Sequence, residues 1–325
     1  ITTVVANHGE PDHSGALAEI VRLAPKATIL CSRRAAEDLP GQYHEDWPMQ
    51  VVRTGDTLDT GTMTMTFIMA PMCHWPDNMM AHLAGPDVLF SNDVFGQHFT
   101  HTRFDDEADA AQLWFEAEKY FVSIISPYGR NVANRLEELE SLDLPIRTIA
   151  PSHGAVWRKD IAGILAAYRR WAAQETDSRV VILYDTMYDS TRLMAETLRD
   201  SLAECDVPTG LYHLATSDRS DVLTHAYGAR GLLIGSSVWH MNVLPSVATL
   251  LEDLKTLRFK DRLVGAFGSY GWQKNLSVEI IERRAREANL DVPLPGVACQ
   301  WRPRDEDLAA CRDFAAHFAA AIKEA

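Results

Sequence analysis

The segment from Asn7 to Gly15, N-H-G-E-P-D-H-S-G, restricts what this chain can fold into more than any other. Two imidazoles and two carboxylates fall within six positions of it: His8, Glu10, Asp12 and His13. The β-branched run at residues 1–5 predicts a buried strand, and a helical pattern follows at residues 14–23, with Ser14 as its expected N-cap. A loop between a strand and a helix can direct several side chains to one point. Imidazole and carboxylate without thiolate suit iron, zinc or manganese, and argue against a structural zinc site built from cysteines.

Three later predicted strands are each followed by a further possible ligand: residues 62–69 by His74, 88–90 by Asp93, and 146–150 by His153. Either histidine alone is more often an ordinary core or surface residue. Together with the opening segment, however, these positions supply four histidines and three carboxylates at strand ends. Strand ends at one edge of a sheet can converge, and such a set is large enough for two metal ions that share a bridging carboxylate.

The second half of the chain alternates short apolar strands with helical patterns. Strands are predicted at residues 180–183, 209–214, 231–236, 263–267 and 296–301, with helices between and after them. Five strands in this pattern predict a doubly wound parallel sheet, which binds ligands outside the carboxyl ends of its strands. The polar stretch at 175–179 marks the junction, so we expect domains at residues 1–177 and 178–325.

Three loops at those strand ends have the composition of a cofactor site. The hydroxyl-rich loop at 184–191 precedes a helix and can hold a phosphate through backbone N–H groups and the helix dipole, although it lacks the G-K-S/T of nucleoside triphosphatases. The loops at 235–242 and 268–272 add glycines, which allow close backbone approach, and aromatic side chains. Aromatic residues more often serve ordinary packing, so the three loops count only together.

The ligand motifs resemble those of the flavodiiron proteins: H-x-E-x-D-H at 8–13, H-W-P-D at 74–77, F-S-N-D-x-F-G-Q-H at 90–98 and S-H-G at 152–154. The resemblance implies a first domain with the metallo-β-lactamase fold, an αββα sandwich whose first strands would precede Ile1. It also implies the ligands: His8, Glu10 and His74 on one iron, Asp12, His13 and His153 on the other, and Asp93 between them. Zinc hydrolases of this fold usually carry histidine at the position of Glu10, and the carboxylate suits iron better.

The second half is similar to flavodoxins, which implies an FMN site in the three loops. The expected contacts are Thr186, Met187, Tyr188, Asp189, Ser190, Thr191, Ser236, Ser237, Val238, Trp239, His240, Asn242, Gly268, Ser269, Tyr270, Gly271 and Trp272. The chain departs from the family at Ser237, where proline is frequent, and at Lys274, where glycine is frequent. The tail at 301–312 resembles the core of flavorubredoxins without their rubredoxin domain, because no cysteine pairs follow.

The resemblance implies an oxidoreductase that reduces nitric oxide, dioxygen or both. Electrons would pass from a rubredoxin-like donor and its reductase through FMN to two irons. A head-to-tail homodimer or a tetramer would bring the flavin of one subunit to the irons of another. Trp75, His98 and Tyr120 are candidates for residues that support the ligands. The sequence leaves open the preference between the two gases, the donor's identity and the extent of the natural chain.

The remaining composition excludes some classes and leaves two alternatives. A net charge of −14 argues against nucleic acid or an anionic membrane as a partner, and no apolar run suggests a membrane helix. The five scattered cysteines, without a C-x-x-C pair, indicate reduced thiols in a cytoplasm.

One alternative function is a binuclear metallohydrolase fused to a flavodoxin, against which Glu10 argues. The other is an FMN electron carrier without a working metal site, which absent first strands would favour and the intact ligand spacing does not.

Overall fold

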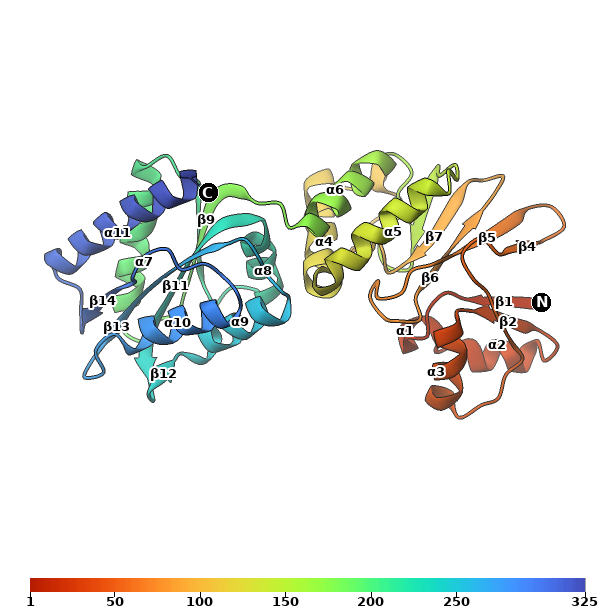
Figure 1. Cartoon of the computed structure of the whole chain (residues 1–325), viewed down its shortest axis with the longest axis horizontal. Coiled ribbons are helices and arrows are strands. Elements are labelled where there is room, and N and C mark those ends of the chain that lie inside the picture. Colours follow the sequence, from red (N-terminus) through yellow and green to blue (C-terminus); the bar gives the residue numbers. More distant parts are fainter. Residues whose placement is uncertain (325) are drawn as a thin grey trace. The chain divides into compact units, whose positions relative to one another are not determined.

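The computed structural model describes residues 1–324. The chain divides into two compact units, Ile1–Ala173 and Gln174–Ala325, called here the N-terminal and C-terminal units (Figure 1). The junction expected after residue 177 lies inside the first strand of the C-terminal unit, β9 (Asp177–Tyr184). Gln174 already belongs to that unit because its side chain donates to the carbonyl of Arg258 at 2.8 Å and accepts from the N–H of Lys260 at 3.1 Å. No helix in the described residues has the length and apolarity needed to cross a bilayer.

The N-terminal unit begins with a three-stranded parallel sheet. Its strands are β1 (Thr3–Ala6), β2 (Thr28–Cys31) and β3 (Met49–Val51), in that order. Helices α1 (Pro11–Ser14), α2 (Leu17–Leu23) and α3 (Arg33–Tyr43) connect them. Helix α3 was not predicted; Ser32 caps it by accepting from the N–H of Ala35 at 3.1 Å. Leu17 and Leu39 pack against Ile29 of the sheet, which gives this layer its own core.

A five-stranded sheet completes the sandwich of the N-terminal unit. It consists of β4 (Thr57–Asp59), β5 (Thr64–Met69), β6 (Met79–Leu83), β7 (Val88–Asn92) and β8 (Thr148–Pro151), in chain order, with only β7 and β8 parallel. Leu30 of the first sheet packs with Phe67 and Met79 of the second, so the two sheets face each other across an apolar layer. This is the predicted metallo-β-lactamase-like arrangement.

Helices cover the outer face of the five-stranded sheet (Figure 1). They are α4 (Ala110–Tyr120), a π-helical turn (Phe121–Ile125), a 3-10 turn (Ser126–Tyr128), α5 (Gly129–Ser141) and α6 (Ile161–Ala173), and a further 3-10 turn (Asp105–Glu107) precedes them. Aromatic side chains join them: the ring of Phe121 lies 5.1 Å from that of Tyr168, between centroids. Tyr168 in turn accepts from the N–H of Phe95 at 2.6 Å, which ties helix α6 to the segment after β7.

The C-terminal unit is the predicted doubly wound parallel sheet. Its strand order is β10 (Thr209–His213), β9, β11 (Ala229–Trp239), β13 (Leu263–Tyr270) and β14 (Val297–Gln300), while β12 (Asn242–Val243) pairs antiparallel with β11. The helices are α7 (Ser190–Glu204), α8 (Arg219–Gly228), α9 (Pro245–Thr256), α10 (Leu276–Glu287) and α11 (Asp305–Glu324). The direction of winding reverses between β9 and β11, which places the topological switch point at the carboxyl ends of these strands.

Candidate metal centre and cofactor pocket

Part of the opening segment is a short helix, α1 (Pro11–Ser14), instead of an irregular loop. Pro11 starts helix α1, because proline is preorganised for the first helical position, so Asp12 and His13 lie on the helix. Ser14 is therefore the last residue of α1 and not the N-cap of a helix over residues 14–23. Its hydroxyl donates back to the carbonyl of Gly9 at 2.7 Å and thereby closes the turn.

The strand ends that carry the predicted ligands belong to two sheets. Strand β1 of the three-stranded sheet leads to His8, whereas β5, β7 and β8 of the five-stranded sheet precede His74, Asp93 and His153. The expectation of a single sheet edge is therefore wrong. The sandwich brings the corresponding ends of two facing sheets together, and the cluster lies where they meet.

Four side chains form the first group of possible ligands. Nε2 of His8 lies 3.2 Å from Oε2 of Glu10 and 3.5 Å from Oδ2 of Asp93. Nε2 of His74 lies 3.3 Å from the same oxygen of Glu10 and 3.8 Å from the same oxygen of Asp93. Two atoms that bind one metal ion at about 2.1 Å lie about 3 Å apart at a right angle and up to about 4.2 Å apart on opposite sides of the ion, so this spacing suits a common ion.

The second group lies on the other side of Asp93. Nε2 of His153 is 3.2 Å from Oδ2 of Asp12 and 3.3 Å from Nε2 of His13. Oδ1 of Asp93 lies 3.1 Å from Nε2 of His13 and 3.3 Å from Nε2 of His153. Two imidazoles and two carboxylates again meet at ligand spacing. The structure thus brings together all of the predicted metal-ligand residues.

Asp93 is the centre of this cluster. Its side chain is 1% exposed, and each of its oxygens faces a different group. Burial disfavours its charge, but hydrogen bonds with His13 and His153 outweigh burial and hold the pKa of Asp93 well below its usual range. For His13, burial is likewise outweighed, chiefly by the hydrogen bond with Asp93, and the pKa of His13 is raised. An ionised carboxylate with one oxygen toward each ligand group is the arrangement of a bridging ligand.

Asp77 supports the first group and was not identified from the sequence, although it is the last residue of the H-W-P-D motif. It is 2% exposed. Its Oδ2 lies 3.0 Å from Nδ1 of His8 and accepts from the N–H of Gly9 at 2.6 Å. A carboxylate on the far nitrogen fixes the orientation of a ligating imidazole. The sequence signal was a carboxylate close to a candidate ligand, which is too common to single out.

The three residues predicted to support the ligands lie around the cluster. Tyr120 donates to Oδ1 of Asp93 at 3.0 Å, and burial, followed by the charge of Asp93, raises the pKa of the phenol. The ring of His98 lies 4.9 Å from that of Tyr120. The ring of Trp75 meets His8 edge-on at 5.2 Å. Tyr120 therefore contacts the carboxylate of Asp93 directly, while His98 contacts the ring of Tyr120.

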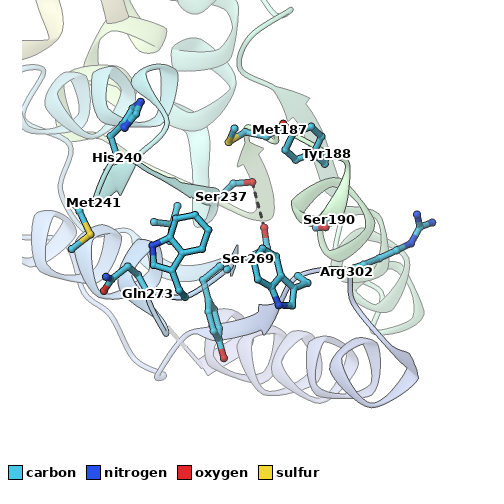
Figure 2. Close-up of a pocket in the computed structure, with 14 residues that line it drawn as sticks. Met187, Tyr188, Ser190, Ser237, His240, Met241, Ser269, Gln273 and Arg302 are labelled. Atoms are coloured by element: carbon cyan, nitrogen blue, oxygen red, sulfur yellow. Dashed lines mark hydrogen bonds between the residues drawn. The ribbon is translucent and has the colours of Figure 1, made fainter.

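The C-terminal unit holds a cavity of about 650 Å³ at the switch point (Figure 2). Predicted contacts that line it are Met187, Tyr188, Ser190, Ser237, Val238, His240, Ser269, Tyr270, Gly271 and Trp272. Lining residues that the sequence analysis missed are Met241, Gln273, Trp301 and Arg302. Figure 2 shows Met241 and Gln273 on one side, Tyr188 and Arg302 on the other, and the hydrogen-bonded Ser237 and Ser269 between them.

The other predicted contacts do not line this cavity: Thr186, Asp189, Thr191, Ser236, Trp239, Asn242 and Gly268. Some lie beneath it. The fully buried hydroxyl of Thr191 lies 3.1 Å from those of both Ser237 and Ser269. Gly268 allows close packing, since a Cβ there would lie 2.3 Å from the carbonyl of Ser236. Consecutive strand residues point to opposite faces, so a loop predicted as a block includes residues that build the floor.

The pocket has the chemistry that FMN requires. Tyr270, Trp272 and Trp301 provide aromatic surface for a flat ring system. Ser190 lies in the first turn of α7, where backbone N–H groups have no acceptor within the helix. Thr186 adds a buried hydroxyl without a hydrogen-bond partner in the described chain. An unsatisfied hydroxyl beside a helix N-terminus suits a phosphate group, so these residues fit the cofactor.

Two family models match the chain. The model described as ODP family beta lactamase matches residues 1–154, and the flavodoxin model matches residues 182–314. Among curated proteins, the chain is 41% identical to a nitric oxide reductase of Moorella thermoacetica, over 99% of this chain and 81% of that protein. It is 38% identical to anaerobic nitric oxide reductase flavorubredoxins of Escherichia coli, over 96% of this chain and 66% of those proteins.

Solved structures show the same architecture. The rubredoxin oxygen:oxidoreductase from Desulfovibrio gigas matches with a TM-score of 0.96 and 30% identity, over 100% of this chain and 82% of that one. The flavodiiron protein from Giardia intestinalis matches with a TM-score of 0.94 and 29% identity, over 100% of this chain and 80% of that one. The likeness extends across both units.

Proposed function

The chain belongs to the flavodiiron protein family, and we propose that it is an oxidoreductase that reduces nitric oxide, dioxygen or both, with FMN and two iron ions as cofactors. The relatives support both gases: one is named a nitric oxide reductase and another a rubredoxin oxygen:oxidoreductase. The observation that carries the proposal is the position of Asp93, with Oδ2 toward His8 and Oδ1 toward His13 and His153.

The bound cofactors supply the redox chemistry. Two molecules of nitric oxide take up two electrons and two protons and give nitrous oxide and water, or one dioxygen takes up four of each and gives two waters. The residues of the chain hold and orient the cofactors for this purpose. His8, Glu10 and His74 would hold one iron, Asp12, His13 and His153 would hold the other, and Asp93, between the two groups, would serve both. Mixed imidazole and carboxylate ligands, with no thiolate, suit iron in this role.

Tyr120 and Asp77 keep the ligands in position. The hydroxyl of Tyr120 donates to Oδ1 of Asp93 at 3.0 Å and so limits rotation of the bridging carboxylate. Asp77 accepts from the backbone of Gly9 and contacts Nδ1 of His8, which leaves Nε2 of that imidazole directed at the cluster. Both residues act through the ligands and are positioning residues.

The cavity of the C-terminal unit would hold FMN. Its aromatic residues, Tyr270, Trp272 and Trp301, would contact the ring system and keep water from it. The loop before α7 would receive the phosphate, with N–H groups of the first helical turn and the hydroxyl of Ser190 as donors. The predicted contact set is revised accordingly: Met241, Gln273, Trp301 and Arg302 are added.

We further propose a rubredoxin-like protein with its reductase as the electron donor. Support comes from the names of two relatives, the flavorubredoxin and the rubredoxin oxygen:oxidoreductase. A head-to-tail homodimer, or a tetramer built from it, would bring the flavin of one subunit to the irons of the next. We place the protein in the cytoplasm, in keeping with its five free cysteines.

Gas consumption tests the proposal, with nitric oxide assayed in the absence of dioxygen. Protein loaded with ferrous iron and FMN is mixed with NADH, a rubredoxin reductase and rubredoxin; nitric oxide and dioxygen are followed by electrode and nitrous oxide by gas chromatography. We expect one gas or both to be consumed faster than by the donor proteins alone, with one nitrous oxide formed per two nitric oxide molecules. Consumption no faster than that background, by protein with full iron and FMN occupancy, would overturn the proposal.

A further inference from the structure

The loop at residues 184–191 of the C-terminal unit, here called the phosphate loop, carries no positive charge for a phosphate. Residues 184–191 read Y-D-T-M-Y-D-S-T, with two aspartates and no lysine or arginine. The first cation after the loop, Arg192, donates to Oδ1 of Asp189 at 2.9 Å and to Oε1 of Glu196 at 3.2 Å, so it is already neutralised. A phosphate that binds here would meet hydroxyls and N–H groups but no unpaired positive charge from the loop or from Arg192. A cation from elsewhere in the fold would supply that charge.

Arg302 is a lining residue of the same cavity and comes from the loop between β14 and α11. Figure 2 shows it on the side of the pocket that carries Tyr188 and Ser190, where α7 begins. The charge of Arg302 also acts on Asp189 of that loop. The pKa of Asp189 is lowered chiefly by Arg192, and in addition by Arg302. The guanidinium therefore lies within electrostatic range of the phosphate loop, although the two segments are more than a hundred residues apart.

The base of Arg302 is fixed, while its guanidinium has no partner among the described residues. Trp301 adopts a left-handed backbone conformation with φ of 62°, and its N–H donates to the carbonyl of Tyr270 at 2.8 Å. Gln300 donates to the carbonyl of Gly271 at 2.9 Å, so the segment is bound to the rim of the pocket on both sides. Within residues 1–324, however, the guanidinium of Arg302 makes no hydrogen bond and no ion pair, whereas nearby Arg304 is paired with Glu306 at 3.0 Å.

We propose that Arg302 binds the phosphate of the flavin and supplies the positive charge that the loop at 184–191 lacks. The proposal rests on the proposed function only in taking FMN as the ligand. A guanidinium can bind phosphate oxygens with two parallel N–H donors, and its flexible stem allows it to turn toward the loop. Arg302 thereby favours the phosphorylated flavin over riboflavin, which has the same ring system and no phosphate.

Paired titrations with the two flavins test this assignment. Full-length protein freed of flavin is titrated with FMN and with riboflavin, and binding is followed by quenching of flavin fluorescence. For Arg302→Gln we expect the Kd for FMN to rise about tenfold and the Kd for riboflavin to stay unchanged. Arg302→Lys keeps the charge and should give an intermediate value. Arg304→Gln, which removes a paired arginine two residues away, is the matched control and should change neither affinity.

Salt and folding measurements complete the experiment. FMN affinity should fall with ionic strength more steeply in the native protein than in Arg302→Gln, because the charge pair is screened. Because the guanidinium of Arg302 has no partner to lose in the part of the chain that the structure describes, circular dichroism and melting temperature should match those of the native protein. These readouts separate a loss of phosphate binding from a loss of folded protein.

The outcomes separate this inference from the proposed function. If Arg302→Gln weakens FMN alone, the assignment stands. If FMN affinity is unchanged, or if both flavins weaken equally, the phosphate assignment is overturned while the flavin site itself stands. If the native protein binds neither flavin, the proposed function and this inference both fall.

Discussion

The two sites are built in opposite ways. In the N-terminal unit, buried charged groups already contact one another: Asp93 is 1% exposed and lies between imidazoles at 3.1 to 3.5 Å. In the C-terminal unit, the polar contacts lie in the floor, and the rim exposes large apolar side chains, among them Tyr188 at 85% and Trp272 at 82%. The metal cluster is thus preorganised by the fold, whereas the flavin pocket leaves apolar surface for the cofactor to cover.

This difference leads us to expect different responses to substitution. Loss of one ligand in the N-terminal unit leaves the other charges of the cluster buried and uncompensated, so effects there should be large. Contacts in the flavin pocket are numerous and individually modest, so effects there should be graded. Each unit should also respond without affecting cofactor content in the other.

The largest effect is expected for Asp93→Asn. The amide cannot offer an anionic oxygen to each ligand group, so iron binding should be lost and gas consumption should fall by at least about a hundredfold. FMN content should stay at the native level. Metal analysis and flavin absorbance measure both. The matched control is Asp105→Asn, which alters another buried carboxylate, one that accepts from backbone N–H groups of residues 158–160, and should keep its iron. Native iron content in Asp93→Asn would show that the metal cluster does not depend on this carboxylate.

A smaller effect is expected for Asp77→Ala. Nδ1 of His8 and the N–H of Gly9 would lose their acceptor, and iron affinity should fall about 10- to 100-fold through misorientation of the imidazole. Competition with a chelator measures the affinity, and melting temperature reports on the fold. A variant that melts earlier but holds iron as tightly as the native protein would show that Asp77 has only a structural role.

The flavin floor should respond more weakly to Thr191→Val. The substitution removes a buried hydroxyl from between Ser237 and Ser269 and should lower the free energy of unfolding of the C-terminal unit by about 1 to 2 kcal/mol. FMN affinity should fall several-fold and iron content should not change. Calorimetry and flavin titration measure these quantities. Loss of iron in this variant would contradict the independence of the two sites.

The smallest effect on folding is expected for Trp272→Leu at the rim. The side chain is 82% exposed, so the free energy of unfolding should change by less than about 0.5 kcal/mol. FMN and riboflavin should both bind about three- to tenfold more weakly, because stacking with the ring is lost. Unchanged affinity for both flavins would show that the exposed aromatic surface serves another purpose.

The sequence predicted the metal cluster better than the pocket, for a physical reason. The candidate ligands follow strand ends within short motifs, and any fold that aligns those ends brings them together. Asp77 escaped notice because its role depends on a contact with His8 across 69 positions. In the pocket, a residue contacts the cofactor only if its side chain points into the cavity. Ser236 accepts from the N–H of Leu244 instead, while its neighbour Ser237 faces the cavity.

The fold, too, was predictable in some parts and not in others. The alternating strands and helices of the C-terminal unit were predicted because the periodicity of apolar residues alone indicates them. Helix α3 was not predicted, since it contains Pro40, which ordinarily interrupts a helix. The role of Ser14 was wrong because Pro11 starts a separate turn three residues earlier. The hydrogen bond from the hydroxyl of Ser14 to the carbonyl of Gly9 then closes that turn, which carries Asp12 and His13.

Metal and flavin content per chain of the purified protein decides between a diiron flavoprotein and the two alternatives. The protein is produced with iron supplied, and iron, zinc and flavin are measured on the same sample. We predict two irons and one FMN per chain. Zinc in place of iron would contradict the redox assignment of the N-terminal unit and favour a hydrolase, and flavin without any metal would leave only an electron carrier.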